Sequence, residues 1–409
     1  MSARGVVGAG PASAAPLSDR ALLMLLAAIT ALGPVATNLY LPALPAVREY
    51  FGASVAEVQA TFSVSLMTFA VGILLWGPFA DRYGRRLAVL AGLSVLLAGA
   101  ALCVAAPSLG WLIAGRAVVA FGAASGLVVA RAMVVDRYAA DRVPRALAHL
   151  TMVAVLGNSL APIAGGYLSA GFGWRGVFGA LFAAAAATAL LAWRHLPETR
   201  HRSGTPPRGV EMLAVAKGLL RQPQFLNCVA QSSAIYATFL VFIALAPYVL
   251  VSALGRPPTE FGYWYLFIAG GYFAGNWLVT RSAARRGQHA MILAGVWLTV
   301  IGAVAALAFV AAGLLHPLWI FVPIGVLSVG QGMALPNVTA IAVGLAPQHA
   351  GVASSVLGFL QQIAGAISVQ ATGVLRTDTA VPVLAFCAIV CVLALLLLWL
   401  FPRAEAGPR

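Results

Sequence analysis

The chain has 409 residues, of which 61% are hydrophobic and only 9% are charged, and its formal net charge is +14. A soluble globular protein carries about 25% charged residues, so this composition excludes an ordinary soluble enzyme and a disordered chain. The excess positive charge would favour a nucleic-acid-binding protein if it formed one patch, and a membrane protein if it lay in loops between apolar segments.

Apolar segments of membrane-spanning length follow one another along almost the whole chain. A spanning helix needs about 20 apolar residues, and we expect such helices at 21–47, 57–80, 86–106, 111–135, 146–169, 175–195, 224–252, 260–282, 289–314, 317–345, 351–375 and 381–402. In lipid, backbone polar groups must be paired within helices or a closed barrel, and residues 381–400 lack the alternation of a barrel strand. The sequence therefore predicts an all-α membrane protein with twelve transmembrane helices.

The basic residues indicate how these helices are oriented. With the N-terminus in the cytoplasm, 20 of the 25 Lys and Arg residues lie on the cytoplasmic side, and only Arg48, Arg175, Arg256 and Arg376 lie outside. Because positive charge gathers in cytoplasmic loops, both termini are predicted to be cytoplasmic. Such loops face anionic lipid, and we therefore expect no nucleic-acid partner.

The longest polar stretch divides the predicted helices six and six. Two six-helix halves around a shared site are typical of secondary transporters. We thus expect a disordered N-terminal tail at 1–20, a six-helix half at 21–196, a cytoplasmic linker at 197–223, a second six-helix half at 224–402 and a C-terminal tail at 403–409.

The loop between the second and third predicted helices combines an acid with arginines and glycines. It reads Gly77-Pro78-Phe79-Ala80-Asp81-Arg82-Tyr83-Gly84-Arg85-Arg86. A simple anchor at the membrane surface would need the arginines but not the acid. The segment resembles motif A of the major facilitator superfamily, whose acid and arginines lock the outward-facing state by pairing with an acid of the fourth helix. Asp136, at the end of the fourth predicted helix, is the matching residue in this chain.

Two further segments resemble motifs of the same superfamily. Arg116 in the fourth helix resembles the motif B arginine, which is tied to proton transfer. An arginine at membrane depth costs about 2.5–3.5 kcal/mol on insertion scales, and the alternative for Arg116 is that it snorkels to the outer surface. The fifth helix resembles motif C, the mark of antiporters, with Ala161 in place of the usual glycine. The residues that carry this likeness are Gly157, Pro162, Gly165 and Gly166.

The resemblance extends over almost the whole chain. Residues 37–45 of the first helix, and Tyr236-Ala237-Thr238-Phe239 and Ala246-Pro247-Tyr248 of the seventh, resemble the bicyclomycin and chloramphenicol resistance branch of the drug:proton antiporters. This resemblance implies a monomeric transporter of the bacterial inner membrane that exports small-molecule drugs by alternating access. It also implies the proton as the coupling ion, with no other cofactor and no metal.

One position departs from that branch, because Asn38 stands where the branch usually has an aspartate. No Asp or Glu lies in the interior of a predicted span, and an amide does not exchange protons as a buried carboxylate does. Three explanations are open: another group carries the coupling, the carrier is uncoupled or differently coupled, or Asn38 is a charge-neutralising substitution. The candidates for coupling are therefore Asn38, Arg116, Glu57 and His149.

We expect the substrate site near the midplane, between the two halves. The candidates are polar and aromatic residues at mid-helix depth, namely Asn38, Tyr40, Asn158, Gln231, Tyr236, Phe239, Tyr265, Tyr272, Asn337, Gln361 and Gln362. A mostly apolar pocket with a few amides and no acid suits neutral amphipathic drugs such as phenicols.

Other functions fit the sequence less well. The alternative within transport is export of a natural metabolite or amino acid, with drugs as side substrates. A membrane enzyme would need a catalytic constellation, but the six His residues are scattered over loop ends without an HExxH pattern. A receptor or scaffold would not need both the Asp81 loop and Pro162. We therefore expect a transporter and not an enzyme.

Overall fold

The computed structural model describes residues 18–139, 141–200, 209–373 and 380–400. Within these ranges the chain forms helices joined by short connections. The predicted C-terminal tail, most of the predicted N-terminal tail and part of the predicted linker lie outside the described residues.

The described helices fall into two groups along the chain. The first group comprises α1 (Asp19–Asn38), a 3-10 turn (Leu41–Ala43), α2 (Leu44–Phe51), α3 (Val55–Tyr83), α4 (Arg85–Ala105), α5 (Leu109–Arg137) and α6 (Val143–His195). The second comprises α7 (Gly209–Leu219), α8 (Pro223–Tyr248) with a π-helical extension (Val249–Ala253), α9 (Glu260–Arg286), α10 (Gln288–Ala311), α11 (Pro317–Gly344), a 3-10 turn (Pro347–His349), α12 (Ala350–Thr372) and α13 (Val381–Leu400).

The lengths of these helices fit a multi-pass membrane protein. In the described part of the chain, nine helical segments are long and apolar enough to cross a membrane. One of them is α6, which is interrupted at Gly173 (φ 67°) and so consists of two helices. Counting α6 twice and adding α9 and α13 gives a helix for each predicted span. The predicted all-α fold is thus confirmed.

The first predicted helix, at 21–47, is in fact broken. The helix α1 ends at Asn38, and the chain passes through the 3-10 turn before α2 begins at Leu44. Pro42 and Pro45 stand at the starts of these two elements, where the missing proline N–H costs no hydrogen bond. A continuous helix would place both prolines in its interior, which disrupts the backbone bonding of the preceding turn.

The break in α6 is also stabilised by specific contacts. Arg175, two residues after Gly173, donates from Nε to the Val104 carbonyl oxygen (3.2 Å) and from Nη2 to the Ala106 carbonyl oxygen (2.8 Å). These carbonyls lie at the end of α4 and would otherwise lack partners. The guanidinium also stacks on the ring of Trp174 at 4.2 Å.

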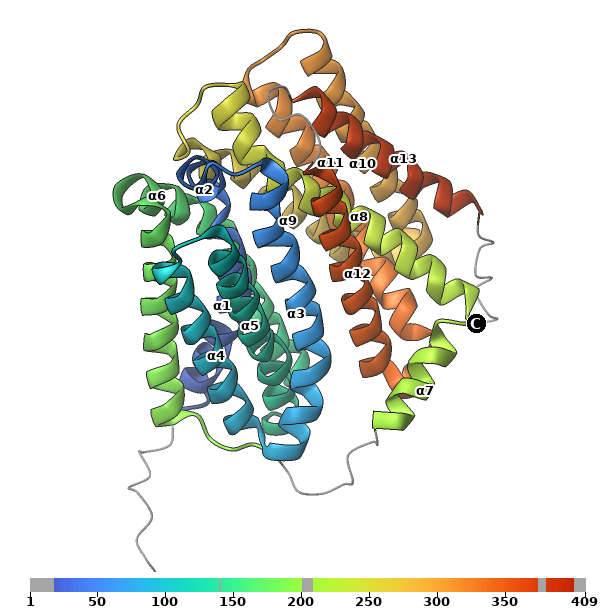
Figure 1. Cartoon of the computed structure of the whole chain (residues 1–409). Coiled ribbons are helices and arrows are strands. Elements are labelled where there is room, and N and C mark those ends of the chain that lie inside the picture. The colour runs from blue at the N-terminus through green and yellow to red at the C-terminus, as the bar shows by residue number, and fades with distance from the viewer. Residues whose placement is uncertain (1–17, 140, 201–208, 374–379, 401–409) are drawn as a thin grey trace, which may run out of the picture.

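The two groups of helices form two bundles, α1–α6 and α8–α13, which touch at one end of the molecule (Figure 1). At the end that carries α2, Gln370 of α12 donates to the Ala56 carbonyl oxygen of α3 (3.2 Å), and Tyr248 of α8 donates to that of Leu44 (3.5 Å). At the opposite end, called the basic end below because it carries the arginines at 82–86, α3 and α12 diverge (Figure 1). The halves are therefore in contact at the α2 end and separated at the basic end.

Candidate transport site

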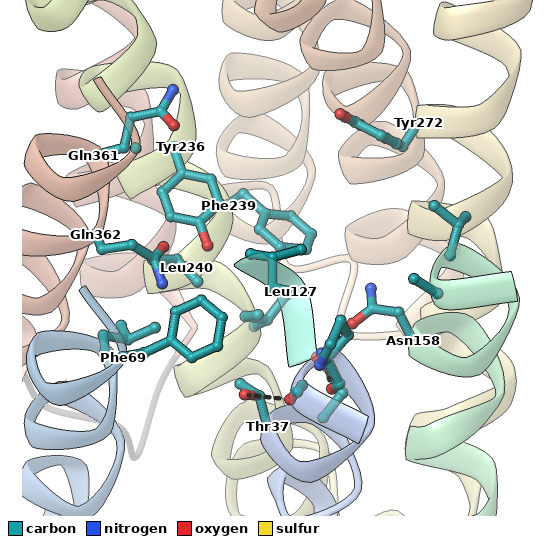
Figure 2. Close-up of a pocket in the computed structure, with 18 of the residues that line it drawn as sticks. Thr37, Phe69, Leu127, Asn158, Tyr236, Phe239, Leu240, Tyr272, Gln361 and Gln362 are labelled. Atoms are coloured by element: carbon teal, nitrogen blue, oxygen red, sulfur yellow. Dashed lines mark hydrogen bonds between the residues drawn. The ribbon is translucent and has the colours of Figure 1, made fainter. Parts of the chain in front are cut away.

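A cavity of about 460 Å³ lies between the two bundles. Four helices of the first half (α1, α3, α5 and α6) and four of the second (α8, α9, α11 and α12) contribute residues to its wall. The wall is mostly apolar, with aromatic rings and amides projecting into it (Figure 2). A concave, mainly apolar site with a few placed polar groups is typical of small-molecule binding.

An amide chain joins the two halves in the cavity wall. The Asn38 Nδ2 atom donates to the Pro34 carbonyl oxygen (3.0 Å) and to Asn158 Oδ1. The Nδ2 atom of Asn158 donates in turn to the Tyr265 hydroxyl (3.3 Å). Asn38 is only 5% exposed, and its Oδ1 has no partner in the described structure. A buried acceptor without a partner is costly, so the amide chain carries one unsatisfied oxygen in this state.

The second half contributes most of the aromatic and glutamine side chains. Tyr236, Phe239 and Tyr272 project into the space from α8 and α9, and Gln361 and Gln362 do so from α12 (Figure 2). Together with Asn38, Asn158 and Tyr265, they are eight of the predicted substrate-site residues that line the cavity.

The three remaining candidates lie outside the cavity wall. Tyr40 is fully buried in the first half, with Arg116 over its ring. Gln231 donates to Asn227 Oδ1 (2.8 Å), and Asn337 donates to the Met333 carbonyl oxygen (2.8 Å) one helical turn away. These three side chains lie at the depth of the cavity, but they are on helix faces that pack against other helices and do not line the cavity.

The cavity wall also includes residues that the sequence analysis missed. They are Thr37, Phe69, Arg131 and Gln331, besides smaller and aliphatic side chains. Gln331 donates to the Ile235 carbonyl oxygen (2.9 Å) of α8. Arg131 lies within the predicted span 111–135 and is one of the charges assigned to the cytoplasmic side. The signal that could have found it is its helix position, one turn beyond Leu127 in an apolar stretch.

The segment that resembles motif A, together with Asp136, forms a cluster at the basic end that we call the clasp. Its members are Gly77, Asp81, Arg82, Gly84, Arg85, Arg86 and Asp136, and its ion pairs centre on Arg85. The Arg85 Nη1 atom donates to Asp81 Oδ1 (2.5 Å) and its Nε atom to Asp136 Oδ2 (2.9 Å). These contacts join α3, α4 and α5 within the first half, so the pairing does not require the halves to meet at the basic end. Side chains of the same loop make other contacts: Arg86 Nη2 donates to the Trp193 carbonyl oxygen (2.7 Å), and Arg82 lies over the Tyr83 ring (5.3 Å).

Of the two clasp glycines, the backbone conformation requires a glycine only at Gly84. Gly84 separates α3 from α4 with φ 105°, a conformation that other residues rarely adopt. A Cβ atom on Gly77 would meet Val128 Cγ1 of α5 at 3.7 Å, an ordinary contact.

The segment of α6 that resembles motif C lies at the closed α2 end. A Cβ atom at Gly165 would meet the Leu39 carbonyl oxygen at 1.9 Å, and one at Gly166 would meet Thr259 Cα, before α9, at 3.1 Å. Gly157 faces Val35 of α1 at 3.0 Å in the same way. Pro162 lies inside the helix, where a missing backbone hydrogen bond favours a kink. This stretch of α6 therefore packs on its own half and on the other half at once.

Comparison with known proteins settles the family. Residues 26–369 match the sequence profile of the Major Facilitator Superfamily. The chain belongs to this superfamily. Its members are transporters, which confirms the prediction of a transporter and not an enzyme.

Relatives within the superfamily point to one branch. The bicyclomycin resistance protein homolog of Haemophilus influenzae is 27% identical over 91% of this chain and 94% of its own length. Multidrug resistance protein D of Escherichia coli is 27% identical over 85% and 86%, respectively. The chloramphenicol resistance protein of Pseudomonas aeruginosa is 26% identical over 90% and 87%. The predicted resemblance to the bicyclomycin and chloramphenicol resistance branch is confirmed.

Solved structures show the same superfamily fold. A D-xylose-proton symporter superposes with a TM-score of 0.76 at 14% identity, covering 95% of this chain and 99% of that one. A bacterial homolog of the human lysosomal transporter Spinster, in an inward-facing and occupied conformation, superposes with a TM-score of 0.74 at 17% identity and the same coverage.

Three of the coupling candidates lie away from the cavity of this superfamily member. Arg116 is 1% exposed, and its Nη1 atom donates to the Ala36 carbonyl oxygen (2.9 Å) while its guanidinium lies 4.8 Å from the Tyr40 ring centre. It does not snorkel to the surface. Glu57 forms an exposed capping box with Ser54 at the start of α3, and His149 is exposed near the start of α6. Of the four, Asn38 alone lines the cavity.

Glu198, which falls in the predicted linker at 197–223, binds the clasp. Its carboxylate accepts from the backbone N–H groups of Arg85 (2.9 Å) and Arg86 (3.2 Å), the first residues of α4. Burial raises the pKa of this carboxyl, but the N–H groups of Arg200, Arg85, Arg86 and Thr199 outweigh it and hold the pKa below its ordinary value. Gly84, the N-cap residue of α4, has no side chain that could accept these hydrogen bonds. Glu198 therefore caps the start of α4 in its place.

We expect Glu198→Gln to loosen the first turn of α4. Protection of the Arg85 and Arg86 amides against hydrogen exchange should fall about two- to fivefold at pH 7, since a charge at a helix N-terminus contributes about 0.3–1 kcal/mol. Because the folded-state pKa of Glu198 is lowered, its stabilisation is present above the ordinary glutamate pKa of about 4.3. It is lost as the pH falls through the lowered value, so the two proteins should converge there.

Hydrogen exchange followed by mass spectrometry checks this prediction. Glu57→Gln, which removes the equivalent carboxylate from α3, is the matched control and should leave α4 unchanged. Equal protection of α4 in the wild-type protein and Glu198→Gln at pH 7 would contradict the capping role.

Proposed function

We propose that the protein exports neutral amphipathic drugs across the bacterial inner membrane by proton-coupled alternating access. The observation that carries this proposal is the cavity between the halves, whose described wall combines aromatic rings and amides with no carboxylate. Such a wall favours apolar molecules that bear a few hydrogen-bonding groups. The names of the relatives, which include multidrug, bicyclomycin and chloramphenicol resistance proteins, support drugs as the substrate class.

The orientation of the protein supports export. With both termini cytoplasmic, as the distribution of arginines favours, the basic end faces the cytoplasm and the described state is inward-open. The cavity then takes up its substrate from inside. Closure of the basic end and separation of the α2 end would release the substrate outside. Because the cavity lies within one chain, this cycle needs a single copy, and we propose that the protein works as a monomer.

Asn38 is the position that we propose for proton coupling. Asn38 lies in the cavity wall and is linked to the second half through Asn158 and Tyr265. An aspartate at this position would bind a proton and meet the substrate in turn. With asparagine at this position, the amide reproduces the shape of the protonated acid without its exchangeable proton. We therefore expect Asn38 to set the coupling, and Asn38→Asp to increase it.

Transport in proteoliposomes tests the function and the coupling together. Uptake of labelled chloramphenicol is measured with and without an imposed pH gradient for the wild-type chain, Asn38→Asp and Gln361→Glu. The last variant is the matched control, because it places a carboxylate elsewhere in the same cavity. We expect gradient-driven accumulation to be at least about tenfold greater for Asn38→Asp, since a tenfold change corresponds to only about 1.4 kcal/mol of driving force.

The outcomes separate the alternatives. Accumulation by Asn38→Asp alone would identify position 38 as the proton site. Accumulation by the unchanged chain would place the coupling at another group and make Glu57 and His149 the next targets. If no variant moves chloramphenicol, the phenicol assignment is wrong, and export of a metabolite or amino acid becomes the better hypothesis.

A further inference from the structure

Arg131 is an unused charge in the wall of the cavity. Among the described residues it is the one acidic or basic side chain that lines this space. Its side chain is exposed although it belongs to a long apolar helix, and no hydrogen bond or ion pair to another described residue satisfies it. An arginine that served only as an anchor would be expected to point to the membrane surface and not into the space between the halves.

The helix register places Arg131 far from the amide chain. Near the middle of the first half, α5 touches α1 at Gly126 and Ile29, where an added Cβ would be 2.5 Å from the Ile29 carbonyl oxygen. Thr30 contacts Gly126 whereas Gly33 contacts Ala123, so the two helices run in opposite directions. With a rise of about 1.5 Å per residue, Arg131 and Asn38 are separated by roughly 20 Å along the helix axes. Arg131 therefore marks the basic-end mouth of the cavity and Asn38 its deep end.

The neighbours of Arg131 define what this mouth would bind. Leu127 precedes it by one helical turn, so the two side chains share a face of α5, and both line the cavity. Across the cavity wall, Thr151 and Val155 of α6 add a hydroxyl and an apolar group. A cation beside an aliphatic surface is complementary to an amphipathic anion.

We propose that Arg131 binds the negatively charged group of amphipathic organic anions at the mouth of the cavity, which makes such anions a second substrate class. The inference rests on the proposed function, because it assigns a further class of molecule to the same cavity. A guanidinium binds carboxylate with two parallel hydrogen bonds, and low-dielectric walls strengthen the field of a single charge. The same charge repels cationic amphipaths, which have no acid to bind in the described wall.

A pair of matched probes tests this proposal. Binding of naphthalene-2-acetate and of its uncharged methyl ester is measured on the full-length protein in phosphatidylcholine nanodiscs, with empty nanodiscs subtracted. We expect Arg131→Gln to weaken binding of the anion about tenfold, as for loss of a charge-assisted hydrogen bond, and to leave ester binding within about twofold. Arg131→Lys should retain most of the anion binding, and added salt should reduce it.

Arg142→Gln is the control variant. Arg142 is exposed at the same end of the molecule and lies outside the cavity wall, so the change in net charge is identical. An equal loss in Arg142→Gln, or none in Arg131→Gln, would overturn the proposal. Ester binding without any preference for the anion would overturn it while leaving the proposed function intact, whereas failure of both probes would count against both. Loss of the preference in phosphatidylglycerol nanodiscs would show that a lipid headgroup occupies the site and would also overturn it.

Discussion

Replacing Gly262 by leucine should open the α2 end of the cavity and stop transport. Gly262 begins α9 in the second half and packs on the backbone of α6 in the first. A Cβ atom there would lie 2.4 Å from Ile163 Cα and 2.6 Å from Ile163 N. Because backbone atoms have no alternative rotamer, the two halves would have to separate to accommodate the side chain.

The size of this effect follows from the cost of overpacking, which is typically about 1–3 kcal/mol. That cost applies only to the state in which the α2 end is closed, so the closed state should lose about ten- to a hundredfold in population. A transporter that does not return to the state with its α2 end closed cannot bind the next substrate molecule from the basic end. Transport should therefore fall by a similar factor. The protein should still fold, because the substitution lies between the halves and not within the core of either.

Cross-linking provides the measurement. A cysteine pair at Ala56 and Gln370, which are in contact across the halves, should form a disulfide readily in the unchanged background and poorly with Gly262→Leu. The control is Gly270→Leu, on the same helix, where an added Cβ meets no atom within 4 Å. Normal cross-linking and transport in Gly262→Leu would show that this close approach is not part of the cycle.

Replacing Arg116 by methionine should lower transport strongly without unfolding the protein. The buried guanidinium has Nε and Nη2 atoms without partners, and no described acid pairs with it, so it contributes little to stability. Methionine fills a similar volume without that desolvation cost. The melting temperature should therefore stay the same or rise.

Transport should nevertheless fall at least about tenfold, because Arg116 holds the end of α1 in place. Its bond to the Ala36 carbonyl oxygen and its contact with the Tyr40 ring lie on either side of Asn38. Without these contacts, the segment that carries Asn38 is free to shift away from Asn158, and the hydrogen bond that ties Asn38 to the amide chain is lost.

Arg175→Met is the informative comparison. Arg175 also binds backbone carbonyls, but at the turn between the two parts of α6 and away from the cavity. We expect this variant to lower the melting temperature and to retain transport per folded molecule. A large loss of stability in Arg116→Met, with transport normal in the protein that folds, would assign Arg116 a purely structural role.

The sequence by itself determined the features that depend on local pattern and composition. The length of each apolar run predicts a spanning helix because lipid leaves no other way to pair the backbone. The resemblance of residues 77–86 to motif A implied that the loop pairs with Asp136, and the structure brings Asp81, Arg85 and Asp136 together. The broken first helix was also visible in principle, since Pro42 and Pro45 do not fit a helix interior.

Only the tertiary structure decided which side chains share the cavity. Asn38 ends α1 and Tyr40 lies in the turn that follows it, so the two side chains meet different surroundings. Asn38 lines the cavity, whereas Tyr40 packs under Arg116. The partner of Asn38 is Asn158, which is remote in sequence, and no local pattern encodes that pairing. Arg131 likewise looks the same as any loop arginine until the position of α6 shows which face of α5 is left open to the cavity.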